Sequence, residues 1–570
     1  MCRKVCLLYI LILGILFFSC GPEELTYDEA VIRLDEAMDG VLAYDNFIQA
    51  GNYLTSKQTA DIASALPDIN TYSITVEPYT QRNDVVVEIF VSTEKSGTRD
   101  PDNWLVIMAE DFNSRNIRIS NGKTAKIRIR KIASGTGYQY IASGKYIPDA
   151  FSPSNHLWIN MVEASGLAVH SITDELVGNT AGIVMKTDIY NELKETYGNV
   201  DVKTIINAVA HGDLSMGYTN PFASSTGLNF LATVLTTFAD GDENIMLSEE
   251  VVSTFEAFQM GVPFVSLTTL QMRDSVQNSG SLEAFVMEHQ TYIRTDELGF
   301  GYEFIPFGIK HSNPLYAIGN ISDDKIEVLE KLAEFLEQDS SKRIAYDYGF
   351  NRVTDYTPKY SAPSGEILIQ AQLLWKEKKD SGRPIVAVFV ADVSGSMGQP
   401  TGRGRARTTP IEMLKIGLSN SSQFINEENY IGLIAFNHEV ERLLEIKRFD
   451  DIHASAFERA IRQMRTSGQT AMFDGIAVAL DMLVSAAQDI PNCKPMIFVL
   501  TDGETNSGYL ESLFDIYSIV DGLNIPIYTI GYNVSIDILS ELSIINEAAN
   551  LNANSDDITF VLGTLLNAEM

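Results

Sequence analysis

Apolar runs alternate with segments of helical spacing along the last third of the chain. Four runs are rich in β-branched residues, as in strands buried on both faces of a parallel sheet: 385–391, 431–436, 496–500 and 525–530. Apolar residues three and four apart predict helices at 411–424, 456–464, 473–487, 510–520 and 536–549. This alternation predicts a doubly wound α/β domain over 384–570.

A second alternation of strand and helix occupies the middle of the chain, over 76–357. Strands are predicted at 85–92, 125–131, 181–185, 214–219 and 262–267. The segment 102–115 places Trp104, Met108 and Phe112 on one helical face, and 324–337 shows the same amphipathic spacing. The middle of the chain is therefore predicted to form a separate α/β domain.

Two connecting segments flank this middle domain. Residues 21–75 are interpreted as a helical spacer, because apolar residues at mixed three-four spacing predict a helix from Asp28 to Leu54. That helix either separates the next domain from the amino terminus or packs against it. Residues 358–383 are interpreted as an inter-domain linker that contains a helix at 367–375.

The amino terminus has the pattern of an export signal. Arg3 and Lys4 precede an apolar run at 5–18, which as a helix would span about 21 Å. This length is short of the roughly 30 Å hydrocarbon core of a bilayer. A signal peptide over 1–20 is therefore predicted, instead of a membrane span.

The end of this signal resembles the bacterial lipobox. It reads Phe17-Phe18-Ser19-Cys20-Gly21, with Phe17 where the motif usually has Leu. The resemblance implies that Cys20 is lipidated and becomes the mature amino terminus. The protein would then be a cell-envelope lipoprotein facing the periplasm or the cell exterior, with membrane contact through its lipid anchor alone. An uncleaved anchor and a plain secretory signal are the alternatives.

Charge and cysteine content narrow the classes of partner and site. Of the 570 residues, 75 are acidic and 42 are Lys or Arg, giving a net charge of −33 at pH 7. Such a field repels phosphate backbones, so no nucleic-acid partner is expected. Three of the four cysteines lie in the first 20 residues, which leaves Cys493 alone and predicts neither a disulfide framework nor a structural zinc site.

Oxygen-bearing side chains follow the predicted strands of the carboxyl-terminal domain. Asp392, Ser394 and Ser396 follow the first strand, Asp502 follows the strand at 496–500, and Thr470 precedes a helix. In doubly wound sheets, binding sites lie outside the carboxyl ends of the strands. Carboxylate and hydroxyl oxygens suit Mg²⁺ or Mn²⁺. A divalent-metal site is predicted at this edge.

These residues resemble the metal-ion-dependent adhesion site (MIDAS) of the von Willebrand factor A family, which has a Rossmann-like fold. The family motif is D-x-S-x-S with a distant Thr and a distant Asp, and all five positions are matched. The resemblance implies that the metal leaves one coordination position for an acidic group of a protein or extracellular ligand. Beyond the motif, Arg403, Arg405 and Arg407 form either a basic rim or a solvated loop.

The middle domain resembles type II periplasmic solute-binding proteins, including molybdate- and sulfate-like binders. The similarity lies in the order of elements, the stretch 148–154 and the closing helical segment 318–350. The resemblance implies a bilobal fold and a small solute or oxyanion as ligand. Polar loops at predicted helix starts supply weak candidate contacts at Ser134, Thr136, Ser154, Asn220 and Ser225.

The motifs favour a binding protein over an enzyme. No HExxH motif, P-loop, nucleophile elbow or paired-carboxylate site for hydrolysis is found. The preferred hypothesis is an exported, lipid-anchored protein that binds a partner through the MIDAS. The alternative is the solute-binding component of a transport system, with the carboxyl-terminal domain as a docking module. Enzymatic and chelatase-like roles are minor alternatives.

Overall fold

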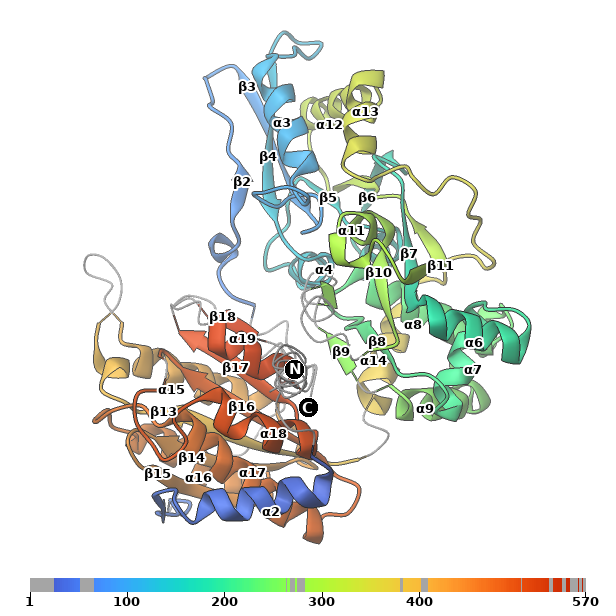
Figure 1. Cartoon of the computed structure of the whole chain (residues 1–570). Helices are drawn as coiled ribbons and strands as arrows, with labels where there is room; N and C mark the ends of the chain where they lie inside the picture. Colours follow the sequence, from blue (N-terminus) through green and yellow to red (C-terminus); the bar gives the residue numbers. More distant parts are fainter. Residues whose placement is uncertain are drawn as a thin grey trace, which may run out of the picture.

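Three β-sheets organise the protein, described here from a computed structural model (Figure 1). The structure describes residues 25–51, 66–262, 264–266, 272–273, 282–379, 383–400, 408–503, 505–532, 537–545, 550–553, 562 and 566. A seven-stranded sheet forms the carboxyl-terminal domain, and sheets of six and five strands form the two lobes of the middle domain. The expected α/β fold class is confirmed.

The seven-stranded sheet has the strand order β1-β15-β14-β13-β16-β17-β18. Its strands are β1 (Ala43–Asp45), β13 (Ile385–Asp392), β14 (Tyr430–Phe436), β15 (Val440–Arg448), β16 (Lys494–Thr501), β17 (Ile527–Tyr532) and β18 (Asn550–Ala553). β13 lies between β14 and β16, parallel to both, and all its residues are buried. Val388 enters the core on one face of the sheet and Phe389 enters it on the other. Burial on both faces explains the continuous apolar run.

Helices cover both faces of this sheet. On the face of Phe389 lie α15 (Pro410–Ser421), the turn η6 (Ser422–Phe424) and α16 (Asp451–Gln463). On the face of Val388 lie α17 (Met472–Asp489), α18 (Leu513–Leu523) and α19 (Asp537–Ile544). These helices occupy the regions where the sequence pattern predicts them, whereas strands β15 and β18 were not predicted.

The amino-terminal helix α2 (Tyr27–Met38) is part of the carboxyl-terminal domain. Its Ala30, Leu34 and Ala37 are buried in the same core as α17 and α18, and β1 pairs in parallel with β15 (Figure 1). The helix approaches α18 so closely that a Cβ added at Gly522 would lie 2.8 Å from the Ala30 Cβ. The segment was predicted as a longer helix, Asp28–Leu54, that spaces or contacts the middle domain. Instead it ends at Met38 and completes the domain farthest from it in sequence.

The middle domain consists of two lobes. The first lobe contains β2 (Ile74–Val76), β3 (Asp84–Val91), β4 (Thr124–Lys131), β5 (Ala150–Ser152), β6 (Val169–Thr173) and β12 (Leu315–Ile318), with the turn η2 (Ile69–Thr71) and helices α3 (Trp104–Ser114), α4 (Ser134–Ala142), α5 (Leu157–Ala164), α12 (Asp323–Leu336) and α13 (Asp339–Asp347). The second contains β7 (Asn179–Lys186), β8 (Met216–Thr219), β9 (Phe264–Ser266), β10 (Ala284–Glu288) and β11 (Tyr302–His311), with helices α6 (Thr187–Tyr197), α7 (Val202–His211), α8 (Ser225–Phe238), α9 (Glu249–Met260) and α11 (His289–Ile293), and turns η3 (Glu243–Ile245) and η4 (Asp296–Leu298). The chain crosses between the lobes at 174–178 and 312–314, so two short connections join them.

The segment predicted as an inter-domain linker contains α14 (Gly365–Lys378). This helix packs on α5 of the first lobe and α8 of the second. Its first residue has no room for a side chain, because a Cβ at Gly365 would lie 2.0 Å from the Asn160 carbonyl oxygen. Trp375 is buried near its end and donates to the Tyr218 hydroxyl over 2.5 Å. The helix is therefore an integral part of the two-lobed domain.

Candidate functional site

The predicted metal ligands meet where β13 and β16 end. The backbone N–H of Ser394 donates to Asp392 Oδ1 over 2.7 Å, which turns the loop directly after β13. The Ser394 and Ser396 hydroxyls lie 3.0 Å apart, and Ser396 donates to Asp502 Oδ1 over 2.8 Å. Hydrogen bonds thus connect four of the five predicted residues into one cluster.

Thr470, the fifth predicted residue, lies on a loop that packs against this cluster. The loop is held by Gly395 N–H donating to Gly468 O over 3.0 Å and by Ser467 N–H donating to Val393 O over 2.8 Å. Gly468 has φ of +72°, a conformation that favours glycine. The Thr470 hydroxyl makes no hydrogen bond with the described residues, although the residue is buried.

Two further residues that were not predicted hold the site in place. Thr501 donates to Asp392 Oδ2 over 2.5 Å, so both oxygens of this buried carboxylate have a partner. Asn506 accepts from the Thr470 N–H over 2.9 Å and donates its own N–H to the Thr470 carbonyl. Thr501 could have been found from its place directly after the predicted strand at 496–500, beside Asp502. Asn506 carries no such signal, because its role depends on a contact across a loop.

The electrostatics of the cluster fit a divalent cation. Burial raises the pKa of Asp392 to about 6, and the nearby Asp502 adds to this rise. Burial also raises the pKa of Asp502. Neither carboxylate forms an ion pair with a Lys or Arg of the described residues. A buried and a half-buried carboxylate with hydroxyls beside them lack a positive charge that a hard cation would supply. No group of three His, Cys, Asp or Glu suited to a metal occurs in the described part of the chain.

The candidate contacts of the middle domain lie at or near the contact between the two lobes. The start of α4, with Ser134 and Thr136, meets the loop after β8 directly, since Gly135 N–H donates to the Ala223 carbonyl over 3.2 Å. A Cβ at Gly135 would lie 1.9 Å from the Phe222 oxygen, so no ligand fits between the lobes at this point.

The remaining three candidates are occupied by intramolecular hydrogen bonds. Ser154 donates to Glu94 Oε1 over 2.5 Å, and Ser225 accepts from the Trp158 indole over 2.9 Å. Asn220 Oδ1 accepts from the Phe222 N–H over 2.7 Å. These side chains therefore shape the lobe interface, and the prediction that they line a common solute site remains untested.

A buried charged pair next to Ser154 was missed by the sequence reading. Lys95 is fully buried and lies 3.7 Å from Glu94, and its ammonium donates to Asn313 Oδ1 over 2.9 Å. Asn313 belongs to the 312–314 connection between the lobes. The pair therefore ties the end of β3 to one of the two connections that any lobe movement must bend.

The mouth of the cleft is lined by charged residues from both lobes. Asp100 and Asp102 from the first lobe pair with Arg294 and Arg273 from the second, over 2.7 Å and 3.7 Å. Together with Lys131 they line a cavity of about 490 Å³. Burial raises the pKa of Asp102 to about 6 despite Arg273. Asp296 and Glu297 also line the cavity, so it carries charges of both signs, at a place other than the predicted contacts.

Sequence families match both domains. Residues 103–351 match the family described as bacterial extracellular solute-binding protein, and residues 387–504 match the von Willebrand factor type A domain. The chain carries a solute-binding domain followed by a von Willebrand factor A (VWA) domain. Both expectations from the sequence are confirmed at the level of the family, and neither family description names a catalytic activity.

Individual similar proteins resemble one domain at a time. An uncharacterized protein of Synechocystis sp. is 22% identical over 182 residues, which are 32% of this chain and 40% of that protein. The sulfate-binding protein SubI from Mycobacterium tuberculosis is 14% identical, covering 51% of this chain and 96% of SubI at a TM-score of 0.34. A von Willebrand factor type A protein from Catenulispora acidiphila is 17% identical, covering 32% of this chain and 42% of that chain at a TM-score of 0.28.

Proposed function

We propose that this protein binds an acidic group of a protein or extracellular ligand at its VWA domain, with Mg²⁺ or Mn²⁺ held at the MIDAS. The supporting observation is the hydrogen-bonded cluster of Asp392, Ser394, Ser396 and Asp502, whose carboxylates have no cationic partner in the described residues. When bound, the metal supplies positive charge and an open coordination position. Ser396 and Asp502 lie at the exposed side of the cluster, where a partner can approach.

The chain's own residues keep this site ready for a cation. Thr501 and the Ser394 N–H fix both oxygens of Asp392, and Asn506 fixes the backbone of Thr470. Because these groups hold the donors in position, little reorganisation is needed when a cation binds. The hydroxyls of Thr505 and Ser507 are buried on either side of Asn506 without a hydrogen-bond partner in the structure. Buried hydroxyls normally have a hydrogen-bond partner, so these two favour water or a ligand at this place.

Thermal unfolding of the whole protein in Mg²⁺ and in EDTA tests the metal site. A cation at one hundred times its Kd stabilises the native state by about 2.7 kcal/mol, so the VWA transition is expected to move to higher temperature. Ser396→Ala should reduce or abolish this shift, because the hydroxyl bridges Ser394 and Asp502. Ser485→Ala, an exposed serine on α17, is the matched control and should keep the full shift. Equal shifts in all three proteins would exclude the assigned site.

Partner binding requires a separate experiment. The envelope fraction of the source cell is passed over immobilised protein with Mg²⁺, and bound material is eluted with EDTA. The proposal expects the EDTA eluate to contain a partner that Ser396→Ala fails to retain. Retention that is unchanged in EDTA would contradict metal-dependent binding even if the metal itself binds.

A second candidate function is solute capture by the two-lobed domain, as part of a transport system. The charged cavity between the lobes, which includes Lys131, Arg273 and Arg294, and the two short connections favour this role. Calorimetry with sulfate and molybdate tests it, with Arg294→Gln expected to weaken binding. A bound oxyanion with no effect of metal on the VWA domain would make the transport role the better description.

We also propose export and lipid attachment at Cys20. The match to an extracellular solute-binding family supports export, and residues 1–20 have signal-peptide character. Cys20 lies outside the described residues, as do Arg403, Arg405 and Arg407. No helix in the described part of the chain is long and apolar enough to cross a bilayer. Mass spectrometry of the amino-terminal peptide from native membranes would detect the acyl groups directly.

A further inference from the structure

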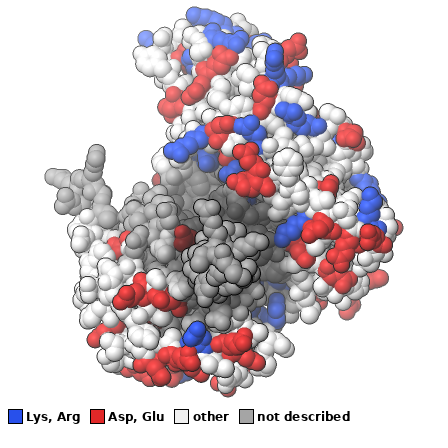
Figure 2. All heavy atoms as spheres, viewed as in Figure 1, with Lys and Arg blue, Asp and Glu red and all other residues white. Residues whose placement is uncertain are grey.

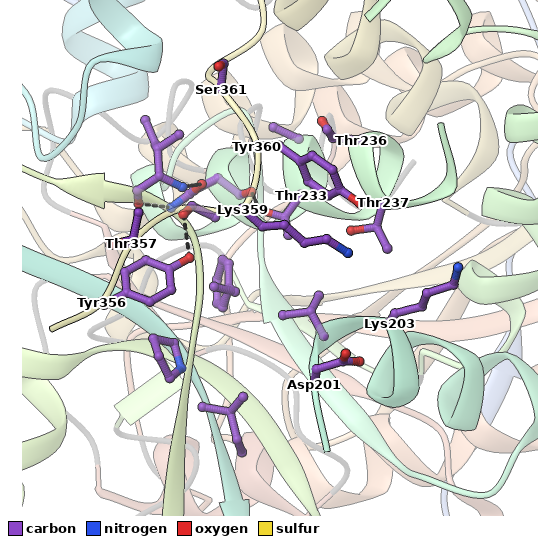
Figure 3. A pocket seen from close by; sticks show the side chains of 18 of the residues that line it. Asp201, Lys203, Thr233, Thr236, Thr237, Tyr356, Thr357, Lys359, Tyr360 and Ser361 are labelled. Atoms are coloured by element: carbon purple, nitrogen blue, oxygen red, sulfur yellow. Dashed lines mark hydrogen bonds between the residues drawn. The ribbon is translucent and has the colours of Figure 1, made fainter. Parts of the chain in front are cut away.

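A cavity of about 330 Å³ lies beside α8, away from the mouth of the cleft (Figure 3). Its walls are the middle and end of α8, strand β11, the start of α7 and the segment 356–363 that leads to α14. Thr237, at the far end of the cavity, follows Ser225 by twelve residues, or about 18 Å along the helix. The cavity extends along α8 from Asn229 to Thr237, so its Thr237 end lies away from the lobe contact at the start of the helix.

One end of the cavity is apolar. A register shift in β11 between Pro306 and Lys310 turns the intervening backbone toward α8, where Asn229 bonds both the N–H and the carbonyl of Ile309 over 3.0 and 2.9 Å. With these polar backbone groups satisfied, the wall presents hydrocarbon. The apolar lining residues are Leu157, Val200, Val202, Ala232, Ile305, Pro306, Phe307, Ile309 and Pro363.

The segment 356–363 is fixed as a cover over this wall. Tyr356 donates to the Gly308 carbonyl over 2.6 Å, and burial raises the pKa of Tyr356 to about 12, so it stays a neutral donor. A Cβ at Gly241 would lie 2.7 Å from the Tyr360 ring, which shows how closely the segment packs on the end of α8. The cover therefore has a defined shape, and the cavity beneath it is a built feature of the fold.

The other end carries charge. Figure 3 shows the Lys359 side chain running across the cavity toward the side where Asp201, Lys203 and Thr237 lie. The Lys359 ammonium lies 4.9 Å from the Tyr360 ring centre, and its pKa is raised by the Tyr360 hydroxyl and further by Asp201, so it is cationic. Lys203 forms no ion pair with the described residues. Lys359, Lys203 and Asp201 are exposed, so this end opens to solvent and carries two ammonium groups and one carboxylate.

We propose that this cavity binds a small amphiphilic carboxylic acid. Its hydrocarbon body would lie along β11 and α8, and its carboxylate would accept hydrogen bonds from Lys359, Lys203 and the Thr237 hydroxyl. A cavity of this size, whose surface is mostly apolar and which also carries charged and hydroxyl side chains, has the character of a small-molecule site. An amine of the same shape should bind less tightly, because it would place a further cation beside two ammonium groups. A neutral alcohol should also bind less tightly, because it supplies no negative charge to pair with them.

Calorimetry on the whole protein with octanoate, 1-octanol and octylamine tests this assignment. Octanoate is expected to bind once per chain, and at least tenfold more tightly than either of the other two. Lys359→Gln and Lys203→Gln should each weaken octanoate binding about tenfold, in the range of a lost charge-assisted hydrogen bond. Lys342→Gln, an exposed lysine on α13 of the first lobe, is the matched control and should have no effect.

A cavity-filling variant tests the location independently of charge. Ala232→Phe places a ring in the cavity from α8 and should abolish octanoate binding while the far-ultraviolet circular dichroism is retained. Octanoate binding that survives in this folded variant, or no octanoate binding to the unaltered protein, would overturn the site. Equal affinity for octanoate and 1-octanol, with no effect of either lysine change, would overturn the choice of a carboxylic acid. If Ala232→Phe does not fold, the two lysine variants decide the question alone.

Discussion

The negative charge of Asp102 lowers the free energy of unfolding of the native protein. One of its carboxylate oxygens is buried without a hydrogen-bond partner, and burial raises the pKa of the group to about 6. Its pKa in the native state is thus above the value of about 4 for an unfolded chain. The native state binds the proton more tightly than the unfolded state, so ionisation of Asp102 destabilises the protein as pH rises through 4 to 6.

Replacing Asp102 with Asn should therefore stabilise the first lobe at neutral pH. A shift of two pH units corresponds to about 3 kcal/mol at most, and partial solvent exposure reduces the expected gain to about 1 kcal/mol. The gain should be present at pH 7.5 and vanish near pH 4, where both proteins carry a neutral group. Chemical denaturation at a series of pH values measures it.

Asp100, in the same loop, provides the contrast. It is more exposed and lies 2.7 Å from Arg294 of the second lobe. Asp100→Asn should therefore leave stability unchanged or lower it slightly at pH 7.5. A gain from Asp100→Asn equal to that from Asp102→Asn would show that the effect comes from net charge, since burial differs between the two residues.

At the scale of elements, the helical conformation of α2 depends on packing against other helices, because α2 has only 12 residues. Its capping box joins Thr26 and Glu29, and a narrow stripe of Ala30, Leu34 and Ala37 faces α17 and α18. Isolated helices of this length are marginal in water, so the contact with the VWA domain is what orders it. The same contact covers apolar surface of α17 and α18 that the rest of the VWA domain leaves uncovered.

Leu34→Ala should destabilise the VWA domain by about 2–5 kcal/mol, the usual cost of a buried leucine. Native-state hydrogen exchange of β13 and β16 reports this domain separately from the two lobes, which need not unfold with it. Ile32→Ala on the same helix is the control, because Ile32 is 59% exposed and should cost little. An equally small effect of both changes would mean that α2 adds nothing to the domain it touches.

At the scale of the whole molecule, the two lobes are in contact through a residue with no room for a side chain. Gly135 brings the start of α4 within hydrogen-bonding distance of the loop at Ala223. Ion pairs at the mouth of the cleft join the lobes a second time. The surface around these contacts carries both signs of charge, whereas acidic side chains gather along the lower edge of the VWA domain in Figure 2.

Gly135→Val should hold the lobes apart. Its Cβ would lie 1.9 Å from the Phe222 oxygen, and backbone on both sides leaves no flexible group to yield. Small-angle scattering is expected to show a larger radius of gyration than for the unaltered protein. Ser143→Val, at the exposed far end of α4, should scatter like the unaltered protein. An unchanged radius in Gly135→Val would mean that the lobes already stand open in solution.

Strands and site residues could be predicted from the sequence where they depend on neighbouring residues. Those that depend on contacts between distant segments could not. The run at 385–391 predicts a central strand because burial on both faces requires an apolar residue at every position. β15 alternates charged and apolar residues around an adjacent Leu443-Leu444 pair, so its pattern is broken and no strand was predicted. Asp392, Ser394 and Ser396 are neighbours in sequence and were found together, whereas Asn506 acts through a contact across a loop.

The same limit explains the middle domain. Ser154 and Ser225 have the residue types of ligand contacts, but their hydroxyls bond Glu94 and Trp158, partners that no local pattern names. The packing of α2 is the extreme case. Nothing in residues 27–38 indicates that their partner helices begin at Met472 and Leu513.

The place of α2 also sets an order of events during synthesis. The ribosome makes Ala30, Leu34 and Ala37 before the two-lobed domain, but β16, α18 and the surface they complete are made more than 450 residues later. At roughly 5–20 residues per second, that interval is on the order of half a minute to a minute and a half. Throughout it the two-lobed domain can fold while the apolar stripe of α2 has no native partner. The helix α2 can therefore reach its native packing only after the last third of the chain has been made.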